Sequence, residues 1–323
     1  MALLEVRNLT KHFDVSDGWY SRWFSGGKAL RAVDGVSFEV AEGKTFGLVG
    51  ESGCGKSTTA RLITRLVPPT DGQVIFAGRD ILRLPKNELR QLRHQIQLIF
   101  QDPYASLNPR MRVSDIVGRP LAIFFGMRGR QKIARVTELL EMVGLGADHL
   151  YRYPHEFSGG QRQRIGIARA LAARPKLIIA DEPVSSLDVS VQAQVLNLLR
   201  QLQRELNLTL LFISHDLNVV GYLADMVGVM YAGKMMEIAP AQDIFNSPWH
   251  PYTKALLAAN PTLQSFMENA PPTLQGEVPL PINPAPGCRL EPRCPLRVEK
   301  CRAMEPLLEA KRSGRWVACH EVN

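Results

Sequence analysis

The segment from Gly50 to Ser57 limits the possible folds of this chain more than any other feature. It reads Gly-Glu-Ser-Gly-Cys-Gly-Lys-Ser, which fits the pattern G-x-x-x-x-G-K-[ST]. An apolar run at 46–49 precedes it, and a helical pattern from Thr58 follows. In this context the glycines let backbone N–H groups curl around phosphates, Lys56 reaches the β- and γ-phosphates, and the Ser57 hydroxyl binds Mg²⁺. The segment therefore predicts a strand, a phosphate-binding loop and a helix.

A second site lies at the end of the apolar segment 177–182, where the residues Asp181 and Glu182 follow a run of strand length. Two acids at the end of a buried strand suit a metal and water site. We expect Asp181 to hold Mg²⁺, directly or through water, and Glu182 to polarise the attacking water. Together with the phosphate loop, this pair predicts hydrolysis of a nucleotide.

Strands and helices alternate through the middle of the chain. Apolar residues follow the 3.6-residue period at 131–143, where Gly144 supplies the stop, and again at 189–206. Residues 177–180 and 208–214 have the length of buried strands. Such alternation predicts an α/β fold with a mainly parallel sheet and helices on its faces.

The N-terminal region reads as strand, loop, strand. Between the strands, residues 14–28 form a predicted loop insertion in a Gly/Ser-rich setting. The aromatic residues of this insertion are Trp19, Tyr20, Trp23 and Phe24.

Composition narrows the class of protein without fixing it. Hydrophobic residues make up 45% of the chain, which permits a proper core. The net charge of +8 fits a basic surface, a nucleic-acid face or contact with an anionic membrane leaflet. No apolar run approaches the roughly 18 residues that span a bilayer, and Glu5 and Arg7 interrupt any signal-like core. We therefore expect a cytoplasmic protein, whose five cysteines are not a disulfide framework.

Residues between the two nucleotide motifs identify the class of hydrolase. Phe157-Ser-Gly-Gly-Gln161, followed by RQRIGIARAL, closely resembles the signature sequence of ABC ATPases, with Phe in place of the more usual Leu. Its Gly-Gly pair, just ahead of a helix, offers free N–H groups to a phosphate. Other elements of that family follow in order: the Q-loop glutamine Gln101, the D-loop 185–188 and the switch histidine His215. The resemblance covers roughly residues 3 to 240.

The resemblance implies a fold and a set of site residues. The fold is the ABC nucleotide-binding domain over residues 1–240, with an antiparallel β subdomain and a helical signature subdomain at about 102–165. The implied catalytic residues are Glu182, His215 and Gln101, and the implied magnesium ligands are Ser57, Gln101 and Asp181. The implied contacts of ATP with the phosphate loop are Gly50, Glu51, Ser52, Gly53, Cys54, Gly55, Lys56, Ser57 and Thr58. Phe13 is the implied residue that stacks on adenine, with the aromatic residues of the insertion at 14–28 as alternatives. The implied contacts to the ATP of a head-to-tail partner subunit are Ser158, Gly159, Gly160 and Gln161. We interpret Cys54 as a small loop residue without a redox role.

Two functions remain for such a chain: a transporter ATPase and a nucleic-acid machine built on the same domain. Chromosome and repair ATPases insert hundreds of residues between phosphate loop and signature, whereas here residues 58–156 fill that interval. Translation-type relatives carry two cassettes, and this chain has one. Transport is therefore the favoured function, with no nucleic-acid partner.

Finer features resemble the ATPases of dipeptide and oligopeptide importers. These features are the segments 100–110, 153–164 and 247–257 and the tail from Pro284. The match is best to the second of the two ATPases that these importers carry. It implies a different ATPase as heterodimer partner, two transmembrane permeases, a periplasmic or extracellular binding protein, and a place on the cytoplasmic face of a prokaryotic membrane. Related importers carry nickel or other solutes, so the cargo stays open.

The tail at 241–323 is predicted to be loop-rich because prolines crowd it and no apolar period survives. Its thiols are spaced Cys288-x5-Cys294-x6-Cys301-x17-Cys319. Zinc sites usually pair ligands at x2–4 spacing, which none of these gaps has. Wider spacing, with Pro295 after Cys294, suits a larger cluster. The resemblance implies a 4Fe-4S cluster on these four cysteines, with structural zinc as the alternative.

Overall fold

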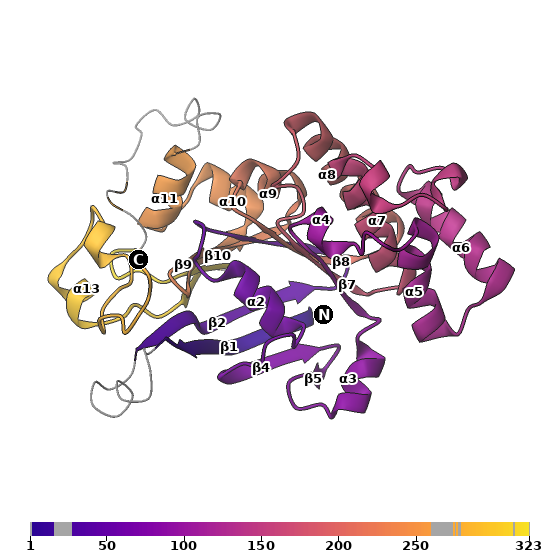
Figure 1. Ribbon diagram of the computed structural model, residues 1–323. Helices are drawn as coiled ribbons and strands as arrows, with labels where there is room; N and C mark the ends of the chain where they lie inside the picture. The colour runs from indigo at the N-terminus through magenta and orange to yellow at the C-terminus, as the bar shows by residue number, and fades with distance from the viewer. Residues whose placement is uncertain are drawn as a thin grey trace. The chain divides into compact units, whose positions relative to one another are not determined.

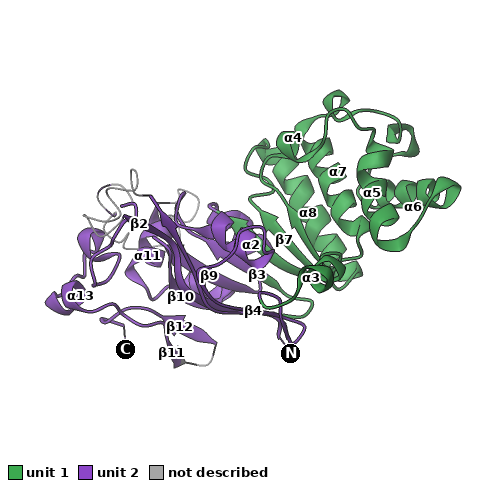
Figure 2. Ribbon diagram, turned by 60° about the horizontal axis from the view of Figure 1, so that its bottom comes forward, with its two compact units in different colours: residues 1, 40–45, 83–214 green, residues 2–39, 46–82, 215–323 purple. Residues whose placement is uncertain are grey.

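The computed structural model describes residues 2–15, 28–259, 274, 276, 279–312 and 314–322. The aromatic residues of the predicted insertion, at 19–24, lie outside the described residues. The chain divides into two compact units (Figure 2). Unit 1 contains residues 40–45 and 83–214, and unit 2 contains residues 2–39, 46–82 and 215–323.

Unit 1 contains a parallel three-stranded arrangement. Strand β7 (Leu177–Asp181) pairs with β6 (Ile96–Ile99) on one side and with β8 (Thr209–Ser214) on the other. Every residue of β7 and β8 is buried. Continuous apolar runs are typical of parallel strands because helices cover both faces. The two predicted buried strands are confirmed.

Helices make up most of the rest of unit 1 (Figure 1). They are α3 (Lys86–Leu92), α4 (Pro103–Ser106), α5 (Val113–Phe125), α6 (Gly129–Met142), α7 (Gly159–Ala172) and α8 (Val189–Glu205), with short 3-10 turns η1 (Ala147–His149) and η2 (Pro154–Glu156). The two predicted amphipathic helices are confirmed as α6 and α8. Helix α6 buries Val136, Leu139 and Leu140 on one stripe.

Unit 2 contains the predicted antiparallel β subdomain. Its strand order is β2 (Ala29–Ala41), β1 (Ala2–Asp14), β4 (Asp71–Phe76) and β5 (Arg79–Asp80). A second set of strands begins with β3 (Thr45–Val49), which pairs in parallel with β9 (Met226–Tyr231). The rings of Phe38 on β2 and Phe46 on β3 stack with centroids 4.7 Å apart, which joins the two sets of strands through the core.

The tail adds regular structure that the sequence pattern did not predict. Strand β10 (Lys234–Pro240) pairs with β9 on one edge and with β12 (Arg315–Val317) on the other, and β11 (Glu309–Arg312) completes the hairpin. These short strands are ordered by pairing with β10 rather than by an apolar period of their own. The remaining helices of unit 2 are α2 (Lys56–Ile63), α9 (Leu217–Leu223), α10 (Ala241–Asn246), α11 (Pro251–Ala258), α13 (Glu299–Ala303) and the turn η3 (Glu291–Arg293).

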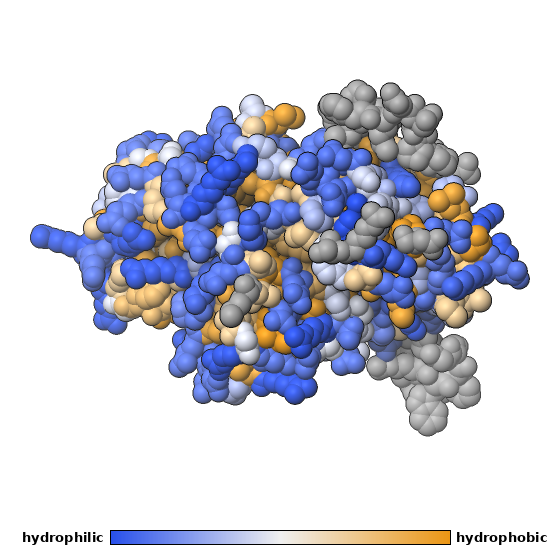
Figure 3. Space-filling view, turned by 180° about the vertical axis from the view of Figure 1, so that it is seen from behind, coloured by the Kyte–Doolittle hydropathy of each residue, from blue (hydrophilic) through white to orange (hydrophobic). Residues whose placement is uncertain are grey.

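Within the part of the chain that the structure describes, no helix combines the length and apolar character needed to cross a bilayer. Hydrophilic residues dominate the face shown in Figure 3, and hydrophobic residues appear on it in separate patches.

Candidate functional site

The phosphate loop connects β3 to α2 within unit 2. Gly50 and Gly55 adopt φ angles of 151° and 108°, which side chains rarely permit. A Cβ on Gly50 would collide with the backbone carbonyl of Met230, and one on Gly55 with that of Ala32. The loop therefore requires glycine at both positions, and Gly55 is also the N-cap of α2.

Lys56 points into this loop. Its side-chain ammonium donates to the carbonyl oxygens of Gly50 at 2.7 Å and Glu51 at 3.0 Å, and only 4% of the residue is exposed. The positive charge is thus concentrated where the loop closes, at the N-terminal end of a helix. Both features attract an anion.

Cys54 lies inside the same loop and is fully buried. Burial raises the pKa of its thiol, although the charge of Lys56 opposes that shift. A thiol that stays protonated and buried is inert in redox chemistry, which supports its interpretation as a small loop residue.

In unit 1, Glu182 and Gln101 lie together. They follow the neighbouring parallel strands β7 and β6, whose carboxyl ends share one edge of the sheet. The Gln101 side-chain amide donates to the Glu182 carboxylate at 3.1 Å. Asp181, the last residue of β7, is 6% exposed. The structure therefore brings three of the predicted hydrolysis residues to one edge.

The backbone of Glu182 is unusual for a residue with a side chain. Its φ angle is 47°, in the left-handed region. Its N–H donates to the carbonyl oxygen of Ile213 on β8, and its own carbonyl accepts from the Ser185 hydroxyl at 3.1 Å. The surrounding segments thus hold Glu182 in a strained conformation that fixes the direction of its carboxylate.

The signature residues form the first turn of α7. Ser158 is the N-cap: its hydroxyl accepts from the N–H of Gln161 at 3.3 Å, while the Gln161 side chain accepts from the N–H of Ser158 at 3.1 Å. This reciprocal pair is a capping box. A Cβ on Gly160 would collide with Val191, so that position is restricted by close packing against α8.

The remaining predicted residues have contacts of their own. Asp188 at the end of the D-loop caps α8 by accepting from the N–H of Val191 at 3.0 Å, and this bond, followed by one from Ser190, lowers its pKa. His215 directly follows β8 and belongs to unit 2, as do Lys56 and Ser57. Phe13 lies on β1, with the Lys11 ammonium 5.0 Å from the centre of its ring.

The four tail cysteines lie in unit 2 around η3, α13 and the end of β12. The backbone N–H of Cys288 donates to the carbonyl oxygen of Cys301 at 2.7 Å. The pKa of Cys288 is raised to about 11, mainly by burial and in smaller part by the charges of Cys301, Cys294 and Cys319. All four thiols are therefore within electrostatic range of one another. Among the described residues, however, no three His, Cys, Asp or Glu side chains are arranged as ligands of a metal ion.

Sequence reasoning missed two residues that contact the phosphate loop. The hydroxyl of Tyr252 accepts from the backbone N–H of Glu51 at 3.0 Å, and burial raises the pKa of this phenol. The guanidinium of Arg293 donates to both carboxylate oxygens of Glu51, at 2.9 and 3.2 Å. No periodicity or motif signals either contact, because more than 200 residues separate the partners.

Family models match two regions of the chain. The model described as "ABC transporter" matches residues 33–185, and the model described as "Oligopeptide/dipeptide transporter, C-terminal region" matches residues 236–301.

Curated relatives match over nearly the whole length. A probable peptide ABC transporter ATP-binding protein, y4tS, of Sinorhizobium fredii is 52% identical over 99% of this chain and 90% of its own. The oligopeptide transport ATP-binding protein OppF of Salmonella typhimurium is 51% identical, over 95% of this chain and 92% of its own. The di/tripeptide transport ATP-binding protein DppF of Pseudomonas aeruginosa is 46% identical, over 99% of this chain and 98% of its own.

Solved structures agree on the fold. The ATP-binding cassette MJ0796, in a dimeric post-hydrolysis state with ADP and Pi, superposes with a TM-score of 0.65 at 29% identity, covering 74% of this chain and 98% of its own. The protein cbiO1 of Clostridium perfringens, part of an ABC transporter complex, superposes with a TM-score of 0.66 at 25% identity. The superposition covers 83% of this chain and 99% of cbiO1.

Proposed function

This chain belongs to the family of ATP-binding subunits of oligopeptide and dipeptide ABC transporters, and we propose that its nucleotide residues act in two groups on two different ATP molecules. Hydrolysis of ATP coupled to transport is the activity of the family. The observation that carries the peptide-importer function is the joint match of the ATPase region and of the C-terminal region typical of peptide transporters.

The first group binds and cleaves ATP at the chain's own phosphate loop. Lys56 contacts the β- and γ-phosphates through an ammonium that already points into the loop. Phe13 stacks on adenine, and His215 contacts the γ-phosphate. The hydroxyl of Ser57, the carboxylate of Asp181 and the amide oxygen of Gln101 are hard oxygen donors of the kind that Mg²⁺ prefers. When bound, Mg²⁺ neutralises charge on the phosphates.

Glu182 acts as the group that polarises the attacking water. Its carboxylate is oriented by a strained backbone and by the hydrogen bond from Gln101. A fixed carboxylate takes a proton from the water as its oxygen bonds to the γ-phosphorus. The bond from that phosphorus to the oxygen bridging it to the β-phosphate breaks, and ADP leaves.

The second group, Ser158 to Gln161, contacts the ATP held by a partner ATPase. The capping box holds the first turn of α7, and its glycines leave N–H groups at the positive end of a 14-residue helix. In a head-to-tail pair, two ATP molecules would then favour the closed arrangement, and hydrolysis would release it.

The proposed partners are a second homologous ATPase, two transmembrane permeases and a substrate-binding protein outside the membrane. The chain is accordingly a peripheral protein of the cytoplasmic face of a prokaryotic membrane. The similarity to bacterial ATP-binding proteins of peptide transporters supports the permease partners.

Stimulation of ATP hydrolysis in the reconstituted transporter tests whether the cargo is a peptide. The chain is co-reconstituted in proteoliposomes with its second ATPase and permeases, and ATP hydrolysis is measured with and without binding protein. We expect peptide-loaded binding protein to stimulate hydrolysis severalfold. Stimulation by a nickel-loaded binding protein, with none by di- or oligopeptides, would replace the peptide function with that of a metal importer.

We also propose that the four tail cysteines bind a 4Fe-4S cluster. Four thiols within electrostatic range of one another fit this centre. Burial raises the pKa of Cys288, Cys294 and Cys319, so a bound cation must displace their protons. The spacing of the four cysteines, with none of the x2–4 gaps that zinc sites usually have, favours the larger cluster over zinc.

Metal analysis of anaerobically purified protein tests this proposal. We expect a brown protein that absorbs broadly near ~400 nm and contains about four irons per chain. Colourless protein with about one zinc per chain would support the zinc alternative instead, and metal-free protein with four freely alkylated thiols would contradict both.

A further inference from the structure

The cysteine segment, defined as residues 288–319, is fastened to the rest of unit 2 by two arginines that are adjacent to cysteines. Arg289 follows Cys288 and donates to the carboxylate of Asp34, and Arg293 precedes Cys294 and donates to the carboxylate of Glu51. Both arginine side chains are almost fully buried, at 5% and 8% exposed. The two contacts reach different parts of unit 2.

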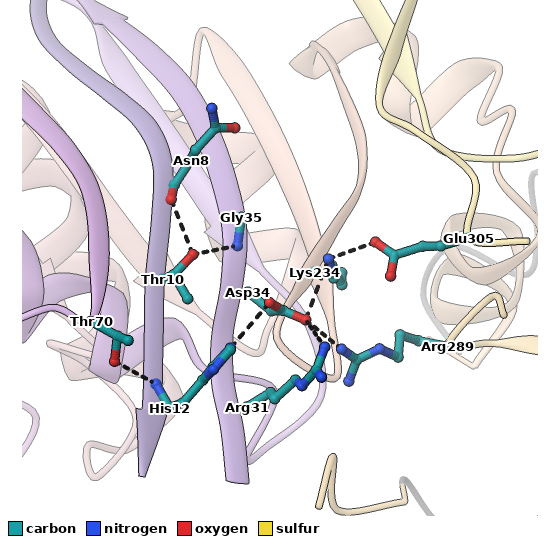
Figure 4. A network of polar contacts seen from close by, with 10 residues as sticks. All are labelled: Asn8, Thr10, His12, Arg31, Asp34, Gly35, Thr70, Lys234, Arg289 and Glu305. Atoms are coloured by element: carbon teal, nitrogen blue, oxygen red, sulfur yellow. Dashed lines mark hydrogen bonds and ion pairs between the residues drawn. The ribbon is translucent and has the colours of Figure 1, made fainter. Parts of the chain in front are cut away.

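The Asp34 contact is a dense cluster of charges (Figure 4). Besides Arg289, the Asp34 carboxylate is paired with Lys234 at 3.4 Å and His12 at 3.2 Å, and Arg31 lies 3.6 Å away. Burial opposes ionisation of Asp34, but Lys234, the hydrogen bond with His12 and the charge of Arg289 together outweigh it and lower the pKa of Asp34. This cluster anchors the segment to strands β1 and β2 without contacting the phosphate loop.

The Glu51 contact, in contrast, is inside the phosphate loop. Every polar group of Glu51 is engaged: its N–H donates to Tyr252, its carbonyl accepts from Lys56, and its carboxylate accepts two bonds from Arg293. Paired hydrogen bonds between a guanidinium and a carboxylate fix orientation as well as charge. The hydrogen bond to Glu51 is the main reason that the pKa of Arg293 lies above its ordinary value.

Glu51 poses an electrostatic problem for a loop that binds polyphosphate. A carboxylate in the loop repels the anionic substrate at short range, where screening is weak. Its side chain is 29% exposed, so solvent neutralises it only in part. Arg293 supplies the compensating charge from the cysteine segment.

We propose that Arg293 is a positioning residue of the ATP site, which holds Glu51 in place and cancels its charge, so that ordering of the cysteine segment sets the affinity of the phosphate loop for ATP. The proposal rests on the assignment of residues 50–57 to ATP binding under the proposed function.

The test is an equilibrium titration of the full-length chain with a fluorescent ATP analogue and Mg²⁺. Arg293→Met is expected to weaken binding about tenfold, because it leaves Glu51 uncompensated beside the phosphates. The double variant Arg293→Met/Glu51→Gln is expected to recover to within about threefold of wild type, since the repelling charge is then gone. In the assembled transporter, Arg293→Met raises KM for ATP and leaves kcat unchanged.

Arg302→Met is the matched control. Arg302 belongs to the same segment but pairs with Glu291 at the surface, with 70% of its side chain exposed. The affinity of Arg302→Met for the ATP analogue is expected to equal that of the wild-type chain. Binding by Arg293→Met that equals the Arg302→Met value would overturn the proposal, and so would a double variant as weak as Arg293→Met.

Two further measurements distinguish failure of the Arg293 proposal from failure of the proposed function of the phosphate loop. Amide hydrogen exchange over residues 288–302 shows whether the segment stays ordered in Arg293→Met. If the segment is disordered, ATP binding is weak and Glu51→Gln does not restore it, then Arg293 has only a structural role. That outcome would overturn the proposal. Lys56→Ala reports on the loop assignment itself. If Lys56→Ala binds ATP like wild type, the proposed function of the loop fails; if it loses binding while Arg293→Met does not, only the present inference fails.

Discussion

At the scale of one residue, Glu182 combines a left-handed backbone with the proposed role of polarising the attacking water. A left-handed φ costs a non-glycine residue about 1 kcal/mol or more, and its neighbours maintain this conformation through the bonds to Ile213 and Ser185. This conformational cost is explained if hydrolysis depends on the direction of the Glu182 carboxylate more than folding depends on a relaxed backbone at that residue.

Replacement of Glu182 by Gln tests its role in hydrolysis. The amide keeps the shape of the side chain but cannot accept a proton, so steady-state ATP hydrolysis by the assembled complex should fall about a hundredfold or more while ATP binding persists. Glu138→Gln, on the surface of α6, serves as the control. Hydrolysis by Glu182→Gln at near the wild-type rate would show that another group polarises the water.

His250 predicts a pH dependence of stability. It is fully buried as the N-cap of α11, where its Nδ1 accepts from the N–H of Tyr252 at 3.1 Å. Burial lowers the pKa of His250 to about 4 from 6.5. Between these values the unfolded chain binds a proton that the folded chain does not. The stabilising contribution is therefore complete above pH 6.5, and about 3 kcal/mol is lost as the pH falls to about 4.

Urea unfolding at pH 7 and pH 4.5 measures this effect. His250→Asn keeps a side chain that can cap the helix and removes the titration, so its stability should change less between the two pH values than that of wild type. An exposed histidine, His155, provides the control variant His155→Asn. Equal pH dependence in wild type and His250→Asn would assign the effect to other groups.

At the scale of elements, one buried ion pair holds the C-terminal hairpin. Arg315 on β12 donates to Glu237 on β10 at 3.4 Å and to the carbonyl of Ser247 at 2.7 Å, and its guanidinium lies 3.6 Å from the centre of the Trp249 ring. Glu237 is completely buried and also accepts from the backbone N–H groups of Trp249 and His250.

Arg315→Met should destabilise the fold by about 3 kcal/mol, because it leaves a buried carboxylate without its cation. Adding Glu237→Gln should restore part of that loss, since the amide is neutral and its single oxygen can still accept one of the two backbone bonds. Lys311→Met on β11, which removes a surface pair with Glu309, is the control. The measurement is the urea midpoint of each variant; a loss in Arg315→Met no larger than in Lys311→Met would contradict a role for the pair.

The elements themselves were predictable to different degrees. The apolar residues are continuous in strand β7 and follow the 3.6-residue period in helices α6 and α8. The local sequence pattern was therefore enough to predict these three elements. The phosphate loop carries a motif whose glycines have no substitute. In contrast, β12 is three residues long and is ordered by pairing with β10, a relation between residues distant in sequence that leaves no local period. The same limit hid Tyr252 and Arg293.

At the scale of the whole molecule, the predicted site residues are shared between the two units. Lys56 belongs to unit 2, and the signature residue Ser158 belongs to unit 1. If the two act on different nucleotides, their substitutions must have different consequences.

Lys56→Ala should abolish ATP binding at this chain's own loop, whereas Ser158→Arg should leave that binding intact and block closure over the partner's ATP. Because Ser158 also caps α7, Ser158→Ala is the matched control: it removes the cap without adding bulk or charge. Fluorescent-nucleotide titration separates the variants. Equal loss of binding in Lys56→Ala and Ser158→Arg would argue against a signature that acts in trans.

The pairing of Glu51 with Arg293 also has a consequence for synthesis of the chain. The two residues are 242 positions apart, so a ribosome adding about 5–20 residues per second completes the phosphate loop roughly 10–50 s before it makes the arginine. During that interval the nascent chain carries a loop whose carboxylate has no counter-charge. On the proposed role of Arg293, the loop of the nascent chain would bind ATP about tenfold more weakly until that arginine is made.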